Sequence, residues 1–184
     1  MNKVFGLISE FSFVREEGTR TVVCYGMEAV DEQNATWIEV YLPKKHNPLI
    51  GFKEVKEAII ADIDACTDEK ILKGFQYEDN DGIVRNVWLS RENQSNYSEA
   101  QRLADKAGSK NYEPVTFKIG EDEDGNAKYR TFDTLSDLNT FYFAVFAYIK
   151  QTLADGWQKK DSIDWTPYES LFPQNEGNSN GGNA

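Results

Sequence analysis

Along the N-terminal part of the chain, hydrophobic and polar residues alternate with the period of a β-strand that has one buried face. The hydrophobic residues of the first segment all occupy odd positions, at Phe5, Leu7, Phe11 and Phe13. A second and a third strand are expected over 21–30 and 37–42, after short polar turns. On the second strand, Val23, Tyr25 and Met27 would share one face. The pattern therefore predicts an antiparallel meander of three strands.

The period then changes to that of a helix. One helical face would carry Phe52, Val55, Ile59 and Ile63. Strands are next expected over 71–77 and 83–89, joined by an acidic turn in which Gly82 can adopt positive φ. Ser90 is a candidate N-cap and Gly108 a candidate end for the following helix. One side of that helix would present Tyr97, Ala100, Ala104 and Ala107.

The same order of two strands and a helix recurs in the C-terminal half. Alternating residues predict strands over 115–119 and 127–132, with the acidic turn 121–126 between them. Asp133 or Thr134 would cap a long helix. Its main stripe is Leu138, Tyr142, Val145, Ile149 and Leu153. The order β-β-β-α followed by two β-β-α units predicts an α+β fold, with antiparallel hairpins and helices packed on one face.

The long helix has more hydrophobic surface than one stripe requires. Outside its main stripe lie Phe141, Phe143, Phe146 and Tyr148. Two explanations remain open: the helix is covered on several sides by its own chain, or one side contacts another subunit.

An extended arm is expected after the long helix, because its aromatic residues follow no regular period. Such residues can dock into pockets on a partner. The candidate partner-binding residues are Trp157, Trp165, Tyr168, Leu171 and Phe172. From Pro173 the sequence is polar and of low complexity, a composition typical of disorder when the segment is alone. The expected organisation is an N-terminal β module over 1–48, an α+β domain over 49–164, and the arm with its tail over 165–184.

Composition narrows the classes of partner. The 20 basic and 31 acidic residues give a net charge of −11, which argues against broad contact with nucleic acid or anionic lipid. No segment approaches the apolar length of a membrane span. The two cysteines, Cys24 and Cys66, do not form a disulfide framework, so both are expected as reduced residues of the core.

The residue types that can act in catalysis or bind a metal do not form a recognisable pattern in this sequence. The only histidine, His46, cannot form a histidine-rich zinc site, although a nucleophilic pair with Cys24 or Cys66 is arithmetically possible. The acidic turns lack the end ligands of a calcium loop. Carboxylate pairs for glycoside cleavage exist among the 31 acids, but none stands out. We therefore expect no catalytic residues, no metal and no cofactor.

One segment resembles a known family. Residues 89–97 read Leu-Ser-Arg-Glu-Asn-Gln-Ser-Asn-Tyr. This resembles the "LS-x-ENQ-x-NY" motif of a bacteriophage family with a domain of unknown function, found in crAss-like and other gut phages. The resemblance covers roughly residues 52–164. The further blocks that are similar to the family are 55–64, 74–77, 114–118 and 156–161. In the motif itself, Asn93, Gln94 and Asn96 are expected either to satisfy free backbone groups at a strand-to-helix joint or to form a binding surface.

The resemblance implies a virion component or an assembly factor, with no catalytic residues to carry over. The leading hypothesis is a structural adaptor, made in the host cytoplasm, that attaches a fibre or similar appendage to the capsid or tail. Its partners would be other virion proteins, with a homo-oligomer also possible. The alternatives are a fibre-assembly chaperone that is absent from the mature virion, a host-directed hydrolase and an acidic DNA mimic.

Overall fold

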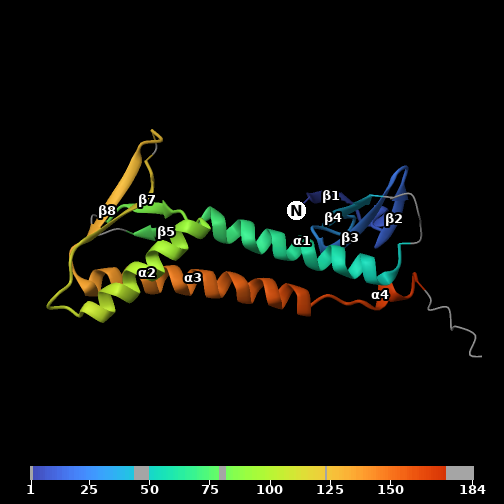
Figure 1. Ribbon diagram of the computed structural model, residues 1–184. Helices are drawn as coiled ribbons and strands as arrows, with labels where there is room; N and C mark the ends of the chain where they lie inside the picture. The colour runs from blue at the N-terminus through green and yellow to red at the C-terminus, as the bar shows by residue number, and fades with distance from the viewer. Residues whose placement is uncertain (1, 44–49, 79–81, 123, 173–184) are drawn as a thin grey trace, which may run out of the picture. The chain divides into compact units, whose positions relative to one another are not determined.

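The computed structural model describes residues 2–43, 50–78, 82–122 and 124–172, and it has the α+β class predicted from the sequence (Figure 1). Every paired strand in it runs antiparallel to its neighbour. The elements in chain order are β1 (Asn2–Leu7), the 3-10 helix η1 (Ile8–Glu10), β2 (Val14–Glu17), β3 (Arg20–Ala29), β4 (Asn34–Pro43), α1 (Phe52–Lys73), β5 (Phe75–Glu78), β6 (Val84–Val87), α2 (Arg91–Ala107), β7 (Val115–Glu121), β8 (Ala127–Phe132), α3 (Leu135–Asp161) and α4 (Thr166–Glu169).

The chain divides into two compact units. Unit 1 comprises residues 1–64 and 159–184, and unit 2 comprises residues 65–158. These boundaries differ from those expected from composition, because the first part of α1 and the segment after α3 belong with the N-terminal sheet. A boundary drawn along the sequence could not anticipate this, since residues of the N-terminal sheet and of the segment 163–172 share one hydrophobic core.

The sheet of unit 1 has four strands in the order β1-β4-β3-β2. The prediction of one continuous strand over Phe5 to Phe13 was wrong, because η1 interrupts it and sends the chain from one edge of the sheet to the other. Only β2, β3 and β4 form a meander, and β1 adds to the far side of β4. Gly6 allows the close packing there, since a Cβ at this position would lie 2.6 Å from the indole of Trp37.

Both faces of this sheet are covered. One face packs against α1 and α4, where Val23, Tyr25 and Tyr168 meet the predicted helical face of Val55, Ile59 and Ile63. On the opposite face, residues of η1 and of the segment after it pack against the sheet. The buried residues of this face are Val22, Cys24, Ala35 and Trp37, with Val4, Ile8 and Phe11 packed against them.

An ion-pair network occupies this second face. Arg15 Nη2 donates to Glu39 Oε1 at 2.6 Å, and the Trp37 indole N–H donates to the same oxygen at 3.1 Å. The Tyr41 hydroxyl donates to Glu39 Oε2 at 2.8 Å. Burial opposes the charge on Glu39, but the hydrogen bonds from Arg15, Tyr41 and Trp37 hold its pKa below the ordinary value. The carboxylate therefore stays ionised although it is buried.

A β-bulge changes the direction of side chains near the end of β3. The pairing with β4 shifts between Tyr25, opposite Ile38, and Glu28, opposite Thr36. Gly26 has a φ of 62°, a left-handed conformation that suits glycine in such a bulge. Because opposite residues share a face, the shift places Glu28 on the same face as Tyr25, where simple alternation would separate them.

Unit 2 is built from two hairpins and parts of three helices. The expected strand over 71–77 was partly wrong, because α1 continues to Lys73 and β5 begins only at Phe75. Ile71 lies in the hydrophobic core as a helical residue. Gly74 ends the helix with a φ of 81°, and any Cβ there would collide with the carbonyl of Val87, which is on β6.

The hairpins β5–β6 and β7–β8 follow the predicted repeat of strands and helices. They lie next to each other through a hydrogen bond from Trp88 N to Ile119 O at 3.3 Å. Gly120 is required at this contact, because a Cβ would lie 2.3 Å from the carbonyl oxygen of Asn86.

The motif at 89–97 forms the joint between β6 and α2. Ser90 caps α2 by accepting a hydrogen bond from Asn93 N at 3.1 Å, as predicted. The Asn93 side chain donates to Trp88 O, and the Gln94 side chain donates to Leu89 O at 2.7 Å. Asn93 and Gln94 thus satisfy backbone carbonyls at the joint, which was one of the two expected roles.

The core of unit 2 is aromatic. Phe141 on α3 contacts the rings of Tyr77, Tyr97 and Phe132. Tyr148 stacks on Phe75, with ring centroids 5.2 Å apart. Of the four surplus hydrophobic residues on the long helix, Phe141 and Tyr148 therefore belong to the core.

Candidate functional site

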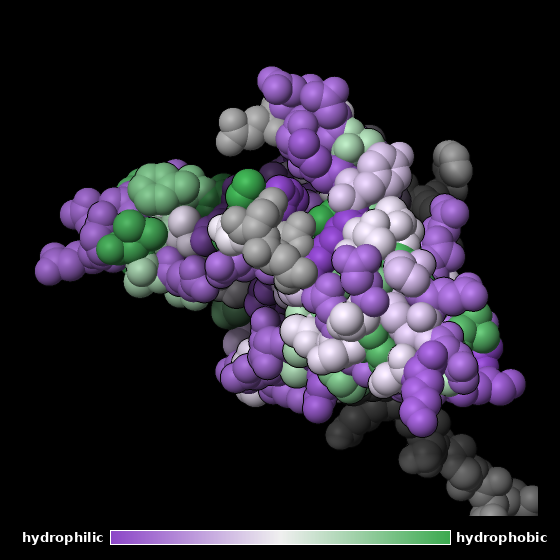
Figure 2. All heavy atoms as spheres, turned by 90° about the vertical axis from the view of Figure 1, so that its left-hand side faces the viewer, coloured by the Kyte–Doolittle hydropathy of each residue, from purple (hydrophilic) through white to green (hydrophobic). Residues whose placement is uncertain are grey.

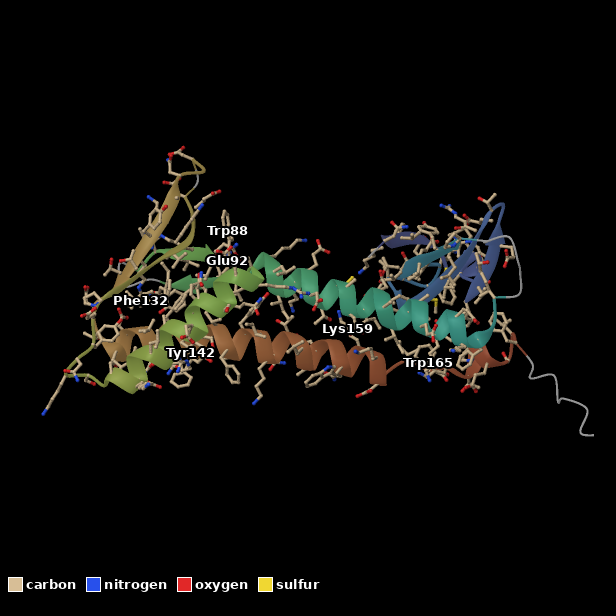
Figure 3. The ribbon with its side chains drawn as sticks, viewed as in Figure 1. Trp88, Glu92, Phe132, Tyr142, Lys159 and Trp165 are labelled. Carbon is tan, nitrogen blue, oxygen red and sulfur yellow. The ribbon has the colours of Figure 1, made fainter. Side chains whose placement is uncertain are left out.

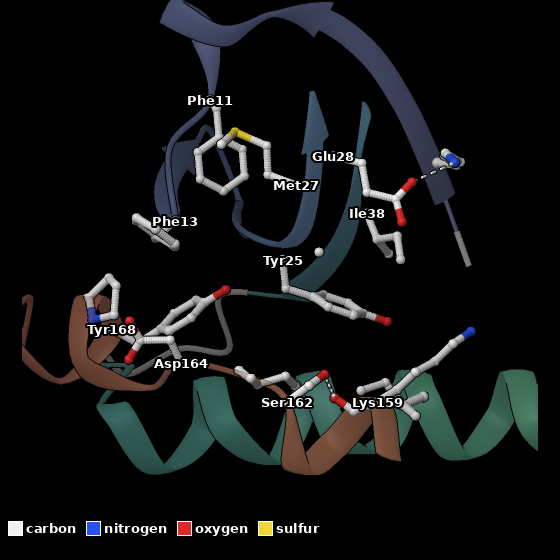
Figure 4. A pocket seen from close by; sticks show the side chains of 15 residues that line it. Phe11, Phe13, Tyr25, Met27, Glu28, Ile38, Lys159, Ser162, Asp164 and Tyr168 are labelled. Atoms are coloured by element: carbon white, nitrogen blue, oxygen red, sulfur yellow. Dashed lines mark hydrogen bonds and ion pairs between the residues drawn. The ribbon is translucent and has the colours of Figure 1, made fainter. Parts of the chain in front are cut away.

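A cavity of about 560 Å³ lies in unit 1, on the face of the sheet that packs against α1 and α4 (Figure 4). Its walls come from four parts of the chain. They are the segment from β1 to the start of β2, the bulge of β3 with its partner in β4, Ile63 of α1, and residues 159–168 at the end of α3 and in α4. Only tertiary structure brings these parts together.

The inner wall of the cavity is aromatic and apolar. The rings of Phe11 and Phe13 meet edge to face at 4.9 Å, and Phe13 meets Tyr168 in the same way at 5.0 Å. Tyr25 and Ile38 lie opposite (Figure 4). The cavity therefore offers ring faces and edges, with which an apolar or aromatic group packs well.

Both phenol groups in the wall use their hydroxyls within the chain. Tyr25 donates to Asp62 Oδ2 at 2.7 Å, and Tyr168 donates to the backbone carbonyl of Cys24 at 2.7 Å. Burial raises the pKa of Tyr168, so its hydroxyl remains a donor. These hydrogen bonds fix the two rings and leave their apolar parts for contact.

The rim of the cavity is charged. Lys3 pairs with Glu28 at one side of it, with 3.6 Å between Nζ and Oε2 (Figure 4). Asp164 accepts a hydrogen bond from the backbone amide of Thr166 at 3.0 Å, and this interaction holds its pKa below the ordinary value. Lys159 also lines the cavity, and its side chain extends on the side where the Tyr25 hydroxyl lies (Figure 4).

An exposed apolar strand continues the same face. In the register of β1 with β4, Lys3 lies opposite Ile38 and Phe5 opposite Thr36, so both share the face of the cavity. Phe5 is 64% exposed and Leu7 43% exposed, although their spacing predicted a buried face. The odd positions of β1 do lie on one face, but the helices do not cover that face at its edge.

A second apolar surface lies on α3 in unit 2. Phe143 is 61% exposed, Phe146 52% and Trp157 57%. The spacings of three and eleven residues place all three on one side of a helix with 3.6 residues per turn. These three residues are called the α3 stripe. By contrast, the face shown in Figure 2 is largely hydrophilic, with hydrophobic residues in separate small groups.

The structure separates the five predicted partner-binding residues. Trp157 and Leu171 are exposed. Trp165, Tyr168 and Phe172 instead pack into the core of unit 1, and Trp165 lies where α4 meets α1 (Figure 3). The described part of the expected arm is thus partly helical and folded onto its own chain, and residues 173–184 lie outside the described residues.

The candidate catalytic residues do not come together. Cys24 is buried, and burial raises the pKa of its thiol to about 11, opposite to the shift that activates a nucleophile. His46 lies outside the described residues. Within the described ranges, no group of three or more His, Cys, Asp or Glu side chains could hold a metal ion. In the second acidic turn, Asp122 accepts hydrogen bonds from the amides of Asp124 and Asn126, which is an ordinary role in a hairpin.

Sequence reasoning missed the cavity residues as a group. Alternation placed Phe11, Phe13 and Tyr25 on strands, and Lys159 lies in the similar block 156–161, but no pattern indicated that these residues line one cavity. The one indication available was glycine within a strand, because Gly26 in an alternating segment suggests a bulge.

Residues 54–173 match the family described as "Domain of unknown function (DUF4376)", and since this match covers more than half of the chain, the protein belongs to that family. The match begins close to the start of the predicted range, 52–164, and extends past its end into the segment that was expected to form a separate arm. Comparison with curated proteins and with solved structures gives no significant match. In the part of the chain that the structure describes, none of the helices combines the length and apolar character needed to cross a membrane.

Proposed function

We propose that this protein is a virion structural adaptor of a bacteriophage, attaching a fibre or similar appendage to the capsid or tail through protein–protein contacts. The proposal rests on one observation: each compact unit presents its own exposed apolar residues. Unit 1 has Phe5, Leu7 and Met27 beside the cavity, and unit 2 has the α3 stripe.

The exposed aromatic residues in these two groups favour a role in binding other proteins. Aromatic side chains dominate the binding energy of protein interfaces, and contiguous exposed apolar patches commonly mark them. An adaptor needs at least two such surfaces, one for each partner. The net charge of −11 keeps the remaining surface soluble and disfavours contact with nucleic acid.

The test is incorporation into particles. We expect the double variant Phe143→Ser/Phe146→Ser to fold normally, because both side chains are exposed, and to be depleted from purified virions. Mass spectrometry of the virions measures the depletion, and circular dichroism checks the fold. Tyr129→Ser is the matched control, because this aromatic residue is 67% exposed but lies on β8.

Two outcomes would contradict the proposal. Normal incorporation of the double variant would remove the role of the α3 stripe. Absence of the wild-type chain from purified virions would favour an assembly chaperone instead. A truncated chain for the same incorporation test should keep all residues up to Phe172. Removing Tyr168 would take a buried ring out of unit 1 and would disturb its fold.

A further inference from the structure

The cavity in unit 1 has the size of a ligand site. Its volume of about 560 Å³ falls within the range of roughly 300–1,000 Å³ that is typical of pockets for small molecules. Its apolar lining with a few polar groups at one side is also typical of such sites.

The apolar part of the cavity suits a ring or a branched alkyl group. Phe11, Phe13 and Met27 lie together around it, away from the helix that carries Lys159 (Figure 4). Since the hydroxyls of Tyr25 and Tyr168 are already hydrogen-bonded within the chain, these walls do not require a polar ligand group.

The charged residues of the rim indicate the sign of the charge that the ligand carries. Glu28 is paired with Lys3, and the Asp164 carboxylate is held by a backbone amide. The neighbouring Lys160 pairs with Asp64 at 2.7 Å. Within the described ranges, no carboxylate is paired with Lys159. Among the described residues of the rim, Lys159 is therefore the cation that can bind an anion without breaking an ion pair found there.

We infer that this cavity binds an apolar carboxylate, with the apolar group between Phe11, Phe13 and Met27 and the carboxylate at Lys159. The inference depends on the geometry of unit 1 and not on the proposed role in the virion. The same chemistry has two sources: a free organic acid, or the carboxyl end of a polypeptide that finishes in an aromatic residue.

The experiment uses the full chain with methionine labelled at its methyl group. The sequence has only Met1 and Met27, so Met27 gives a single internal methyl signal in an NMR spectrum. The probes are 3-phenylpropionate and its neutral analogue 3-phenylpropionamide. We expect the acid to shift the Met27 signal and to bind about tenfold more tightly than the amide, because a charge-assisted hydrogen bond is stronger than a neutral one.

Two variants assign the effect to the cavity. Lys159→Gln should reduce the affinity for the acid to that for the amide, whereas Lys150→Gln, an exposed lysine elsewhere on α3, should leave it unchanged. The fluorescent probe 8-anilinonaphthalene-1-sulfonate serves as a second reporter of binding in the cavity. Its binding should be lost in Met27→Glu, because the new carboxylate repels the anionic probe.

The inference is overturned if the amide binds as tightly as the acid, if Lys159→Gln has no effect, or if the Met27 signal does not shift with either probe. A short peptide ending in phenylalanine, with a free or an amidated carboxyl end, distinguishes the sources. Tighter binding of the free-ended peptide than of 3-phenylpropionate supports a chain end, and weaker binding supports a free acid.

Discussion

The two units bury their hydrophobic residues in different ways. Unit 1 encloses a four-stranded sheet between helices on one face and a polar network around Glu39 on the other. Unit 2 has two separate two-stranded hairpins and a core of interlocking aromatic rings centred on Phe141. Each unit also includes a buried ion pair, Arg15–Glu39 in unit 1 and Arg130–Asp137 in unit 2. The comparison therefore teaches that the units differ in their hydrophobic cores: a four-stranded sheet packs against helices with aliphatic and aromatic residues, whereas small hairpins depend on large aromatic side chains.

The largest expected effect is in the aromatic core of unit 2. Phe141→Ala should destabilise the protein by about 3–5 kcal/mol, because it removes a fully buried ring that contacts three others. Amide hydrogen exchange, followed by mass spectrometry, should show the loss of protection mainly in residues 65–158. Phe146→Ala is the matched control on the same helix, and an equal loss in both variants would contradict the assigned core.

The second effect concerns the ion-pair network of unit 1. Glu39→Gln should cost about 2–3 kcal/mol at neutral pH, because it leaves Arg15 without its closest carboxylate partner. Arg15 is partly exposed, which keeps the cost below that of a fully buried pair.

The same variant predicts a dependence on pH. Since the pKa of Glu39 is lowered in the folded state, its contribution to stability is complete above the ordinary value of 4.5 and is lost as pH falls through the lowered pKa. The difference in denaturation midpoint between wild type and Glu39→Gln should therefore shrink below about pH 4.5. Glu32→Gln, an exposed turn residue, is the control, and a constant difference down to strongly acidic pH would count against this role.

A smaller effect is expected where α4 contacts the sheet. Tyr168→Phe should cost about 1–2 kcal/mol, because it removes one buried hydrogen bond to Cys24 and keeps the ring. Amide hydrogen exchange should become faster in unit 1, and urea denaturation should give the size of the change in the free energy of unfolding. No change in either measurement would mean that the C-terminal segment does not stabilise unit 1 through this bond.

The smallest effect has the opposite sign and concerns Tyr97, a buried residue of α2. The Tyr97 hydroxyl is buried, and no hydrogen-bond partner for it exists in the described part of the chain. Burial raises its pKa to about 12. Tyr97→Phe should therefore stabilise unit 2 by about 1 kcal/mol, because an unsatisfied buried hydroxyl is costly. A loss of stability on thermal denaturation would show that the hydroxyl is bonded after all.

Local patterns predicted the repeat of hairpins and helices well. Ser90, Gly82 and Gly108 occupy the cap and turn positions expected of them, because capping and positive φ depend on a few adjacent residues. The helical face of Val55, Ile59 and Ile63 was also correct. By contrast, the strand expected over 71–77 was correct only from Phe75, since a short apolar segment fits either a strand or the end of a helix.

The sequence by itself determined the α+β class and the order of most elements, because these depend on short-range periodicity. Only the tertiary structure decided which hydrophobic residues are covered: Phe5 and Phe143 are exposed, whereas Tyr168 is buried. It also decided that β1 joins β4 and that residues 159–168 line a cavity with the N-terminal sheet. The physical reason is that burial and cavity shape depend on contacts between distant segments, and no local period records them.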